Sequence, residues 1–166
     1  VKNNVKKLLE HDSMENVLDR LRRTSRDNAR TPMQWSDDEY AGFSKSNPIQ
    51  KVISNYRTIN VKNQLETENS ILKSYQKLIH LRRFSEYSDV LIFGKFRLVD
   101  ENHNDVFAYE RWNENKKLCV IANFRPFVTN FDLPEGNCIY SNYGRTQTLG
   151  SELNPFEVII VELKHV

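Results

Sequence analysis

The spacing of the apolar residues changes near residue 88, and this change constrains the fold more than any other feature. Before it, apolar residues recur at helical spacing between stretches rich in Asn, Ser and Asp. Beyond Asp89, runs of Val, Ile, Phe and Tyr recur about every 8–12 residues with turn residues between them. The 166 residues suit one domain, or one domain with an appendage. We therefore expect two parts, residues 1–88 and residues 89–166.

Three helices are predicted in the first part. Residues 1–10 place Val and Leu at helical spacing with lysines on the other side. Ser13 is a candidate N-cap for a second helix, which a basic cluster around Arg22 closes. Residues 70–83 predict the third helix, with a wide apolar face. The stretch between them, 25–69, is irregular, but we expect it to be ordered because several aromatic and aliphatic side chains can anchor it.

The second part predicts an antiparallel sandwich or curled sheet. Its two cysteines, Cys119 and Cys138, lie in strand-like runs, so we expect two buried, reduced thiols, which weakly favours a cytosolic compartment. Six runs are candidate strands: Leu91–Val99, Val106–Trp112, Lys117–Phe124, Val128–Leu133, Cys138–Tyr140 and Phe156–Leu163.

Composition and spacing argue against several kinds of chemistry. The formal net charge of +2 is too small to indicate nucleic acid or a membrane surface as a partner, although five arginines lie within residues 20–30. The longest apolar runs fall far short of the roughly 20 residues that span a bilayer. The four histidines lack metal-ligand spacing, and the five glycines form neither a phosphate loop nor a nucleophile elbow. We expect no metal site and no cofactor.

Residues 25–35, Ser-Arg-Asp-Asn-Ala-Arg-Thr-Pro-Met-Gln-Trp, carry the most distinctive chemistry. The residue before a proline favours extended geometry, so no helix should continue through Thr31 and Pro32. A loop that holds Arg30 beside Trp35 could bind a polyol, because a guanidinium can bridge a hydroxyl and a carboxylate. The alternative is that Arg26 and Arg30 only pair with local carboxylates and carbonyls.

The same eleven residues closely resemble a signature of the α-amylase superfamily. They point to its branch of cytosolic α-glucosidases, which contains oligo-1,6-glucosidases, dextran glucosidases and trehalose-6-phosphate hydrolases. The resemblance covers essentially the whole chain. Shorter segments that resemble the branch follow in order: Ala41–Phe43, Asn55–Tyr56, Ile59–Val61, Leu78–Arg83, Val120–Phe124 and Asn154–Glu157.

The resemblance implies an α+β architecture. Residues 1–88 would be the last helical part of a catalytic (β/α)8 barrel, and residues 89–166 an antiparallel all-β C-terminal sandwich domain. It also implies a retaining, exo-acting α-glucosidase, cytoplasmic, in which a nucleophilic carboxylate and an acid lie about 5–5.5 Å apart. In this family those carboxylates lie on earlier barrel strands. We therefore expect no catalytic residue here and no activity from the chain alone, which begins with Val and reads as part of something longer.

By the same resemblance, Arg30 is the one substrate-binding residue, and it would contact the terminal glucose of a small oligosaccharide. Residues expected to order its loop are Arg26, Asp27, Asn28, Gln34 and Trp35. Trp35 is expected to pack rather than to stack on sugar. Where the family commonly has Pro-Trp, this chain has Pro48-Ile49, which leaves that loop's contribution to acceptor binding and the glucosidase subtype open.

The expected partner of this segment is the barrel that precedes it in such enzymes. Without that barrel, its apolar faces predict self-association. Three alternatives stay open from the sequence. The chain could belong to a trehalose-6-phosphate hydrolase. Its β domain could be a carbohydrate-binding module that uses Trp112, Tyr140 or Tyr143, or a structural cover for the barrel.

Overall fold

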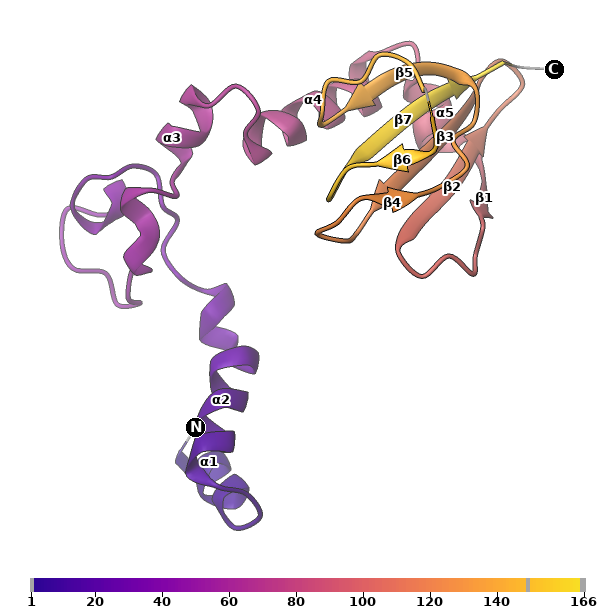
Figure 1. Ribbon diagram of the computed structural model, residues 1–166. Coiled ribbons are helices and arrows are strands. Elements are labelled where there is room, and N and C mark those ends of the chain that lie inside the picture. Colours follow the sequence, from indigo (N-terminus) through magenta and orange to yellow (C-terminus); the bar gives the residue numbers. More distant parts are fainter. Residues whose placement is uncertain (1, 149, 165–166) are drawn as a thin grey trace. The chain divides into compact units, whose positions relative to one another are not determined.

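A computed structural model describes residues 2–148 and 150–164 (Figure 1). The chain forms two compact units, Val1–Leu72 and Lys73–Val166. The functional division into residues 1–88 and 89–166 stays a prediction. None of the helices in the described part of the chain is both long enough and apolar enough to cross a membrane.

The first unit begins with two helices that the sequence predicts. Helix α1 spans Lys2–Leu9; residue 1 of the predicted helix lies outside the described residues. Helix α2 spans Met14–Thr24, and Ser13 is its N-cap, because the Ser13 hydroxyl accepts the N–H of Asn16 at 3.3 Å. This contact satisfies one of the helix's otherwise unpaired first N–H groups, and the prediction of the cap is confirmed.

The predicted irregular stretch, 25–69, contains more regular structure than its sequence indicates. Three single 3-10 turns and one short α-helix lie within it. They are η1 (Arg26–Ala29), η2 (Glu39–Gly42), η3 (Ser54–Arg57) and α3 (Val61–Glu66). Helix α3 has only six residues, which is too short for an apolar repeat to recur, and for this reason periodicity misses it.

The second unit contains most of helix α4 (Ile71–Phe84), which agrees within a residue with the predicted 70–83. Helix α5 (Ser88–Phe93) contradicts the predicted strand Leu91–Val99, of which only β1 (Lys95–Val99) is a strand. Packing overrides the β propensity of this run, because a helical turn buries Val90 and Leu91 together in one apolar cluster.

The second unit is built on a five-stranded antiparallel sheet in the order β1-β2-β3-β7-β5, with a two-stranded sheet of β4 and β6 beside it in the fold. The antiparallel β domain predicted from the sequence is therefore confirmed. Beyond β1, the strands are β2 (Val106–Trp112), β3 (Lys117–Asn123), β4 (Thr129–Asn130), β5 (Gly136–Ser141), β6 (Glu152–Leu153) and β7 (Val158–Leu163).

Both faces of the large sheet carry an apolar core. On one face, Ala108, Ile121 and Ile159 pack with Phe131 and Leu153 from the β4–β6 side. On the other face, a second cluster joins the sheet to α4 and α5. Its members are Val90, Leu91, Leu118, Val120 and Ile160, with Leu78, Leu81, Tyr87, Tyr109, Ile139 and Tyr140 packed against them. The sheet is thus covered on both sides, by different layers.

Two further predictions about the β domain need correction. The predicted strand Val128–Leu133 is reduced to the two residues of β4, because the chain pairs there only with the short β6, which was not predicted. Cys119 is buried as expected, but Cys138 is only half-buried; both are free thiols. Strand β5 is at the sheet edge and β-bulged at Cys138, so its side chain is less covered.

Candidate functional site

The motif 25–35 lies in the first unit, directly after α2. That helix ends where the N–H of Ser25 donates to the carbonyl of Leu21 at 2.9 Å. The turn η1 follows, and residues 30–35 then run without helix or strand, as the Thr31-Pro32 step predicts. Pro32 is buried and Arg30 is exposed, so the motif turns its proline inward and its second arginine outward.

The distal end of the motif is anchored to helix α3. The carbonyl of Gln34 accepts the N–H of Val61 at 2.9 Å, and the carbonyl of Trp35 accepts that of Lys62 at 3.0 Å. The side chain of Gln34 also donates from Nε2 to the carbonyl of Ile59. The first N–H groups of α3, which have no partner inside the helix, are therefore satisfied by the motif itself.

Asn60 completes this anchor and was missed from the sequence. Its side chain is buried, accepts the N–H of Asn63 at 2.8 Å through Oδ1, and donates through Nδ2 to the carbonyl of Tyr56 at 2.8 Å. An Asn at the residue before a helix is the ordinary N-cap signal, so the Asn60-Val61 step could have revealed it.

A left-handed turn holds the other side of Trp35. Tyr40, Ala41 and Gly42 have φ values of 53°, 59° and 63°. This conformation is costly for residues other than glycine. It points the Ala41 carbonyl at two N–H groups, those of Trp35 at 2.9 Å and Ser36 at 3.1 Å. The backbone of Trp35 and Ser36 is thus held by three hydrogen bonds, two to the Ala41 carbonyl and one from Lys62, while the Trp35 indole is half exposed.

The proximal half of the motif contacts α2. Asn28 donates from Nδ2 to the carbonyl of Arg22 at 2.6 Å. Arg26 is exposed, and the side chain of Asp27 lies outside what the structure describes. Arg23, which precedes the motif on α2, pairs with Asp19 at 2.7 Å.

Arg30 differs from Arg23. Among the described residues, none forms a hydrogen bond or ion pair with its guanidinium, and none joins it to Trp35. The structure therefore brings Gln34 and Trp35 together with α3, and Asn28 together with α2, and leaves Arg30 on the exposed stretch between two anchored ends. The roles of Arg30 in binding and of Arg26, Asp27, Asn28, Gln34 and Trp35 in ordering the loop stay predictions.

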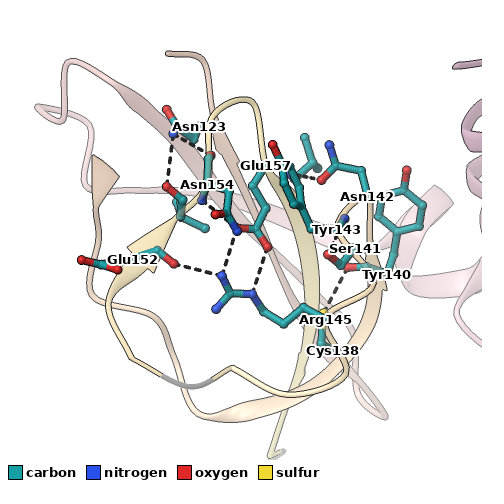
Figure 2. A network of polar contacts seen from close by, with 12 residues as sticks. Asn123, Cys138, Tyr140, Ser141, Asn142, Tyr143, Arg145, Glu152, Asn154 and Glu157 are labelled. Carbon is teal, nitrogen blue, oxygen red and sulfur yellow. Dashed lines mark hydrogen bonds and ion pairs between the residues drawn. The ribbon is translucent and has the colours of Figure 1, made fainter. Parts of the chain in front are cut away.

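A second polar cluster lies in the β domain (Figure 2). Arg145 binds Glu157 with two hydrogen bonds, each 2.9 Å, from Nε to Oε1 and from Nη2 to Oε2. Asn154 adds its backbone N–H at 2.8 Å and its Nδ2 at 2.9 Å, both to Oε2. Burial raises the pKa of Glu157, but the Arg145 and Asn154 donors outweigh it and leave this pKa below its usual value.

This cluster is structural rather than reactive. The Glu157 side chain is 0% exposed, and donors from its own chain engage both of its oxygens. Arg145 also donates to the carbonyl of Glu152 at 3.0 Å, which ties β6 to the segment before β7. Among residues 2–148 and 150–164, no three His, Cys, Asp or Glu side chains gather in a way that could hold a metal ion.

Comparison with known proteins gives two family matches that together span most of the chain. The description "Alpha amylase, catalytic domain" matches residues 1–89, and "Alpha amylase, C-terminal all-beta domain" matches residues 96–151. The gap between the two descriptions, residues 90–95, contains most of helix α5 and the first residue of β1.

Named relatives agree with these descriptions. The oligo-1,6-glucosidase of Bacillus cereus is 37% identical over 163 residues, which cover 92% of this chain and 28% of that protein. The trehalose-6-phosphate hydrolase of Bacillus subtilis is 34% identical, covering 86% of this chain and 27% of its own length. The crystal structure of trehalose-6-phosphate hydrolase from Bacillus licheniformis matches with a TM-score of 0.86 at 30% identity, and the match covers 98% of this chain and 31% of that structure's chain. The chain thus spans less than a third of the proteins it matches.

Proposed function

Because the chain belongs to the alpha-amylase family, we propose that it is the C-terminal portion of a retaining, exo-acting α-glucosidase. The proposed reaction is hydrolysis of α-glucosidic bonds, α-1,6 or similar, in short oligosaccharides. The fold is that of a catalytic-domain part followed by an antiparallel C-terminal β domain. The names of the relatives support the proposal, since they include oligo-1,6-glucosidases.

One observation carries the role proposed for this segment: an exposed guanidinium on an anchored loop. Both ends of the motif are fixed by hydrogen bonds to α2 and α3, so Arg30 is positioned without being used by any described residue of its own chain. A guanidinium with five donors in one plane suits the hydroxyls of a terminal glucose. We propose that Arg30 binds that glucose in the full-length enzyme.

The reacting carboxylates are proposed to come from elsewhere in the longer protein. A retaining glycosidase needs a nucleophile and an acid that face the substrate. Glu157 is buried and saturated by donors, and Glu110 is bound by both Arg97 and Lys117. The chain alone should release no glucose from isomaltose, maltose or trehalose 6-phosphate. Measurable release that a substitution within the chain abolishes would overturn this proposal.

A chimera tests Arg30 directly. In it, this chain replaces the aligned 163-residue portion of the Bacillus cereus oligo-1,6-glucosidase. Loss of a hydrogen bond to a charged group costs about 1.5–3 kcal/mol, so Arg30→Ala should lower kcat/KM for isomaltose by roughly 10- to 150-fold. Arg23→Ala removes an exposed arginine of the same cluster and should leave kcat/KM unchanged. Equal kcat/KM values for the two variants would refute the role of Arg30.

Trehalose 6-phosphate is the alternative substrate, and a named relative supports it. The β domain as a carbohydrate-binding module is less well supported. Tyr140 packs in the apolar cluster with α4 and α5, Trp112 lies under the guanidinium of Arg97 at 5.8 Å, and the exposed Tyr143 donates its hydroxyl to the carbonyl of Pro155 at 2.8 Å. These three side chains have different surroundings and do not form one platform.

We further propose the catalytic barrel as the intramolecular partner of this segment, with the β domain as its structural cover. A cytoplasmic location, a small oligosaccharide as the ligand, and the absence of nucleic-acid and membrane partners stay predictions. So does self-association of the chain by itself, which sedimentation velocity at two concentrations would reveal.

A further inference from the structure

The left-handed turn of residues 40–42 is closed by a contact that only a glycine permits. Gly42 has a φ of 63°, and the side on which a side chain would lie faces Ser36. A Cβ at this position would lie 2.5 Å from Ser36 Oγ and 3.5 Å from the Ser36 backbone nitrogen. The first distance is far inside van der Waals contact. The backbone of the turn therefore packs directly on Ser36, the residue that follows the motif 25–35.

Ser36 cannot give way without losing hydrogen bonds. Its hydroxyl donates to Oδ2 of Asp38 at 2.7 Å and accepts the N–H of Asp38 at 3.3 Å. Its own N–H donates to the Ala41 carbonyl at 3.1 Å. A side chain at position 42 would therefore either rotate the Ser36 hydroxyl away from Asp38, or displace the Ser36 backbone and stretch its bond to Ala41.

The conformation of Gly42 also sets the direction of the Ala41 carbonyl. This carbonyl belongs to the planar peptide unit between the two residues, so a change in φ at Gly42 turns it. In the observed turn it accepts the N–H groups of both Trp35 and Ser36. Positive φ is costly for a residue with a side chain. A substituted residue 42 would therefore favour negative φ and turn the carbonyl away from Trp35 and Ser36.

A short stretch with little freedom joins Trp35 to Arg30. Pro32 lies within it, and this residue is buried and has a fixed φ. Gln34 and Trp35 each accept an N–H of α3, while the Ala41 carbonyl holds the N–H of Trp35. Loss of the Ala41 contact would leave α3 alone to hold this end of the motif, and the backbone that carries Arg30 would be less well fixed.

Strain in the turn supports a functional role. Tyr40 and Ala41 have φ values of 53° and 59° although both carry side chains. Such residues persist only where the surrounding structure enforces them, and they cluster at active sites and ligand clamps. In this chain the enforced turn is hydrogen-bonded to the end of the motif that carries Arg30.

We propose that Gly42 and Ser36 are positioning residues for substrate binding by Arg30. Their close contact holds the Ala41 carbonyl against the motif, and the motif in turn holds the Arg30 guanidinium in place. The proposal rests on the binding role given to Arg30 above. It adds a requirement which that role does not contain, namely a residue without a side chain at position 42.

The test uses the chimera with the Bacillus cereus oligo-1,6-glucosidase. Gly42→Ala should lower kcat/KM for isomaltose by roughly tenfold, since misplacement of a binding group by about 1 Å can cost up to about a hundredfold. Ser36→Ala removes the oxygen that the new methyl group would meet, and the Cβ of residue 36 would lie 3.5 Å from that methyl group. The double variant Ser36→Ala/Gly42→Ala should therefore be at least about threefold more active than Gly42→Ala, a recovery that general destabilisation would not produce.

Gly144→Ala is the matched control. Gly144 also has a positive φ, 76°, but it lies in the β domain, and a Cβ there would meet no described atom within 4 Å. This variant should leave kcat/KM unchanged. Circular dichroism checks the fold of every variant. If Gly42→Ala does not fold but the double variant folds and is active, the contact is supported. If neither folds, Gly42 is needed for the fold itself and the positioning role is overturned.

A measurement on the chain itself needs no activity. Amide hydrogen exchange at Trp35 and Ser36 should accelerate in Gly42→Ala and slow again in the double variant, because both N–H groups donate to the Ala41 carbonyl. Exchange rates equal to those of the wild type in Gly42→Ala would show that the turn does not depend on this contact and would overturn the proposal.

A double-mutant cycle with Arg30→Ala separates positioning from a structural role. If Gly42 acts through Arg30, adding Gly42→Ala to Arg30→Ala should not lower kcat/KM further. Additive losses, an unchanged kcat/KM for Gly42→Ala, no recovery in the double variant, or an equal loss for Gly144→Ala would each refute the positioning role alone. An Arg30→Ala variant as active as the wild type would overturn the binding role of Arg30, and the positioning role with it.

Discussion

Removal of the Arg145 guanidinium should strongly destabilise the β domain. Glu157 is fully buried, and Arg145, whose side chain is 19% exposed, supplies two of the four hydrogen bonds to its carboxylate. The variant Arg145→Met keeps most of the side-chain volume and leaves the carboxylate with the two donors of Asn154. Both of those donors bind Oε2, so Oε1 loses the partner that it has in this network.

The size of the effect follows from the burial of the charge that remains. Breaking a buried ion pair by removing one partner typically costs about 3–5 kcal/mol. We expect the lower end, roughly 3 kcal/mol, because Asn154 still donates and the partly exposed position of Arg145 admits water. For a domain of 60–100 residues, each kcal/mol shifts Tm by about 4–8 °C, so the variant should melt roughly 12–24 °C lower.

The loss should depend on pH in a defined direction. In the wild type the pKa of Glu157 is below its unfolded value, so the ion pair's stabilisation is complete above the unfolded pKa of about 4.3. It is lost as pH falls through the folded pKa. Without Arg145, burial raises the pKa of Glu157, and the variant gains by taking up a proton as pH falls. The difference in unfolding free energy between the two should therefore shrink between neutral pH and pH 4.

Urea unfolding measures this difference, followed by Trp112 fluorescence in a Trp35→Phe background. Arg125→Met is the control. It breaks a more exposed pair with Asp105 and should cost less than about 1 kcal/mol. A loss below 1 kcal/mol for Arg145→Met, or an equal loss at pH 4 and pH 7, would refute the argument from an uncompensated buried charge.

Three further changes test other contacts. Arg111→Met removes the donors to the last carbonyls of α5 and should cost about 1–3 kcal/mol in urea unfolding; a change within error would contradict this. Asn60→Ala removes a buried N-cap, which typically costs a helix about 1 kcal/mol of stability, so hydrogen exchange in α3 should accelerate about fivefold. Unchanged exchange rates would argue against the anchor. Burial raises the pKa of the Cys119 thiol to about 12. In a Cys138→Ser variant at pH 8, a thiol reagent should therefore label Cys119 only as fast as the domain unfolds. Labelling of Cys119 faster than unfolding would contradict this.

Local signals in the sequence were enough to predict several elements. Ser13 caps α2, and the pattern of α4 gives its limits within a residue, because both features depend on residues a few positions apart. Strand β2 coincides with the predicted run Val106–Trp112 for the same reason: its alternation reflects one covered and one partly open face. The antiparallel class of the β domain follows from many such short runs.

The remaining features depend on contacts between distant residues. Leu91–Phe93 has the composition of a strand. It is helical because the helical conformation packs Val90 and Leu91 on the sheet face and lets the Arg111 guanidinium bind the Val90 carbonyl. Among the described residues, strands β4 and β6 pair only with each other, and more than twenty residues separate them in the sequence, so neither can be predicted from its own neighbours. In the candidate site, the sequence predicted an ordered stretch that is extended at Thr31 and Pro32, but the turn at Ala41 and the cap at Asn60 that hold this stretch could not be seen as one anchor without coordinates.

Glu157 and Arg30 differ in whether their own chain supplies hydrogen-bond partners, and this difference distinguishes a structural role from a binding role. A buried carboxylate such as Glu157 is stable only when its own chain supplies the donors, and a group engaged in this way has no capacity left for a substrate. Arg30 is the opposite case: the chain fixes the backbone on both sides and, within the described residues, leaves the guanidinium unbound. An enzyme whose binding residues must be ready before the substrate arrives needs this second kind of site. The buried ion pair of Arg145 and Glu157 stabilises the β domain, and the role proposed for Arg30 in a glucose pocket depends on its guanidinium being unengaged.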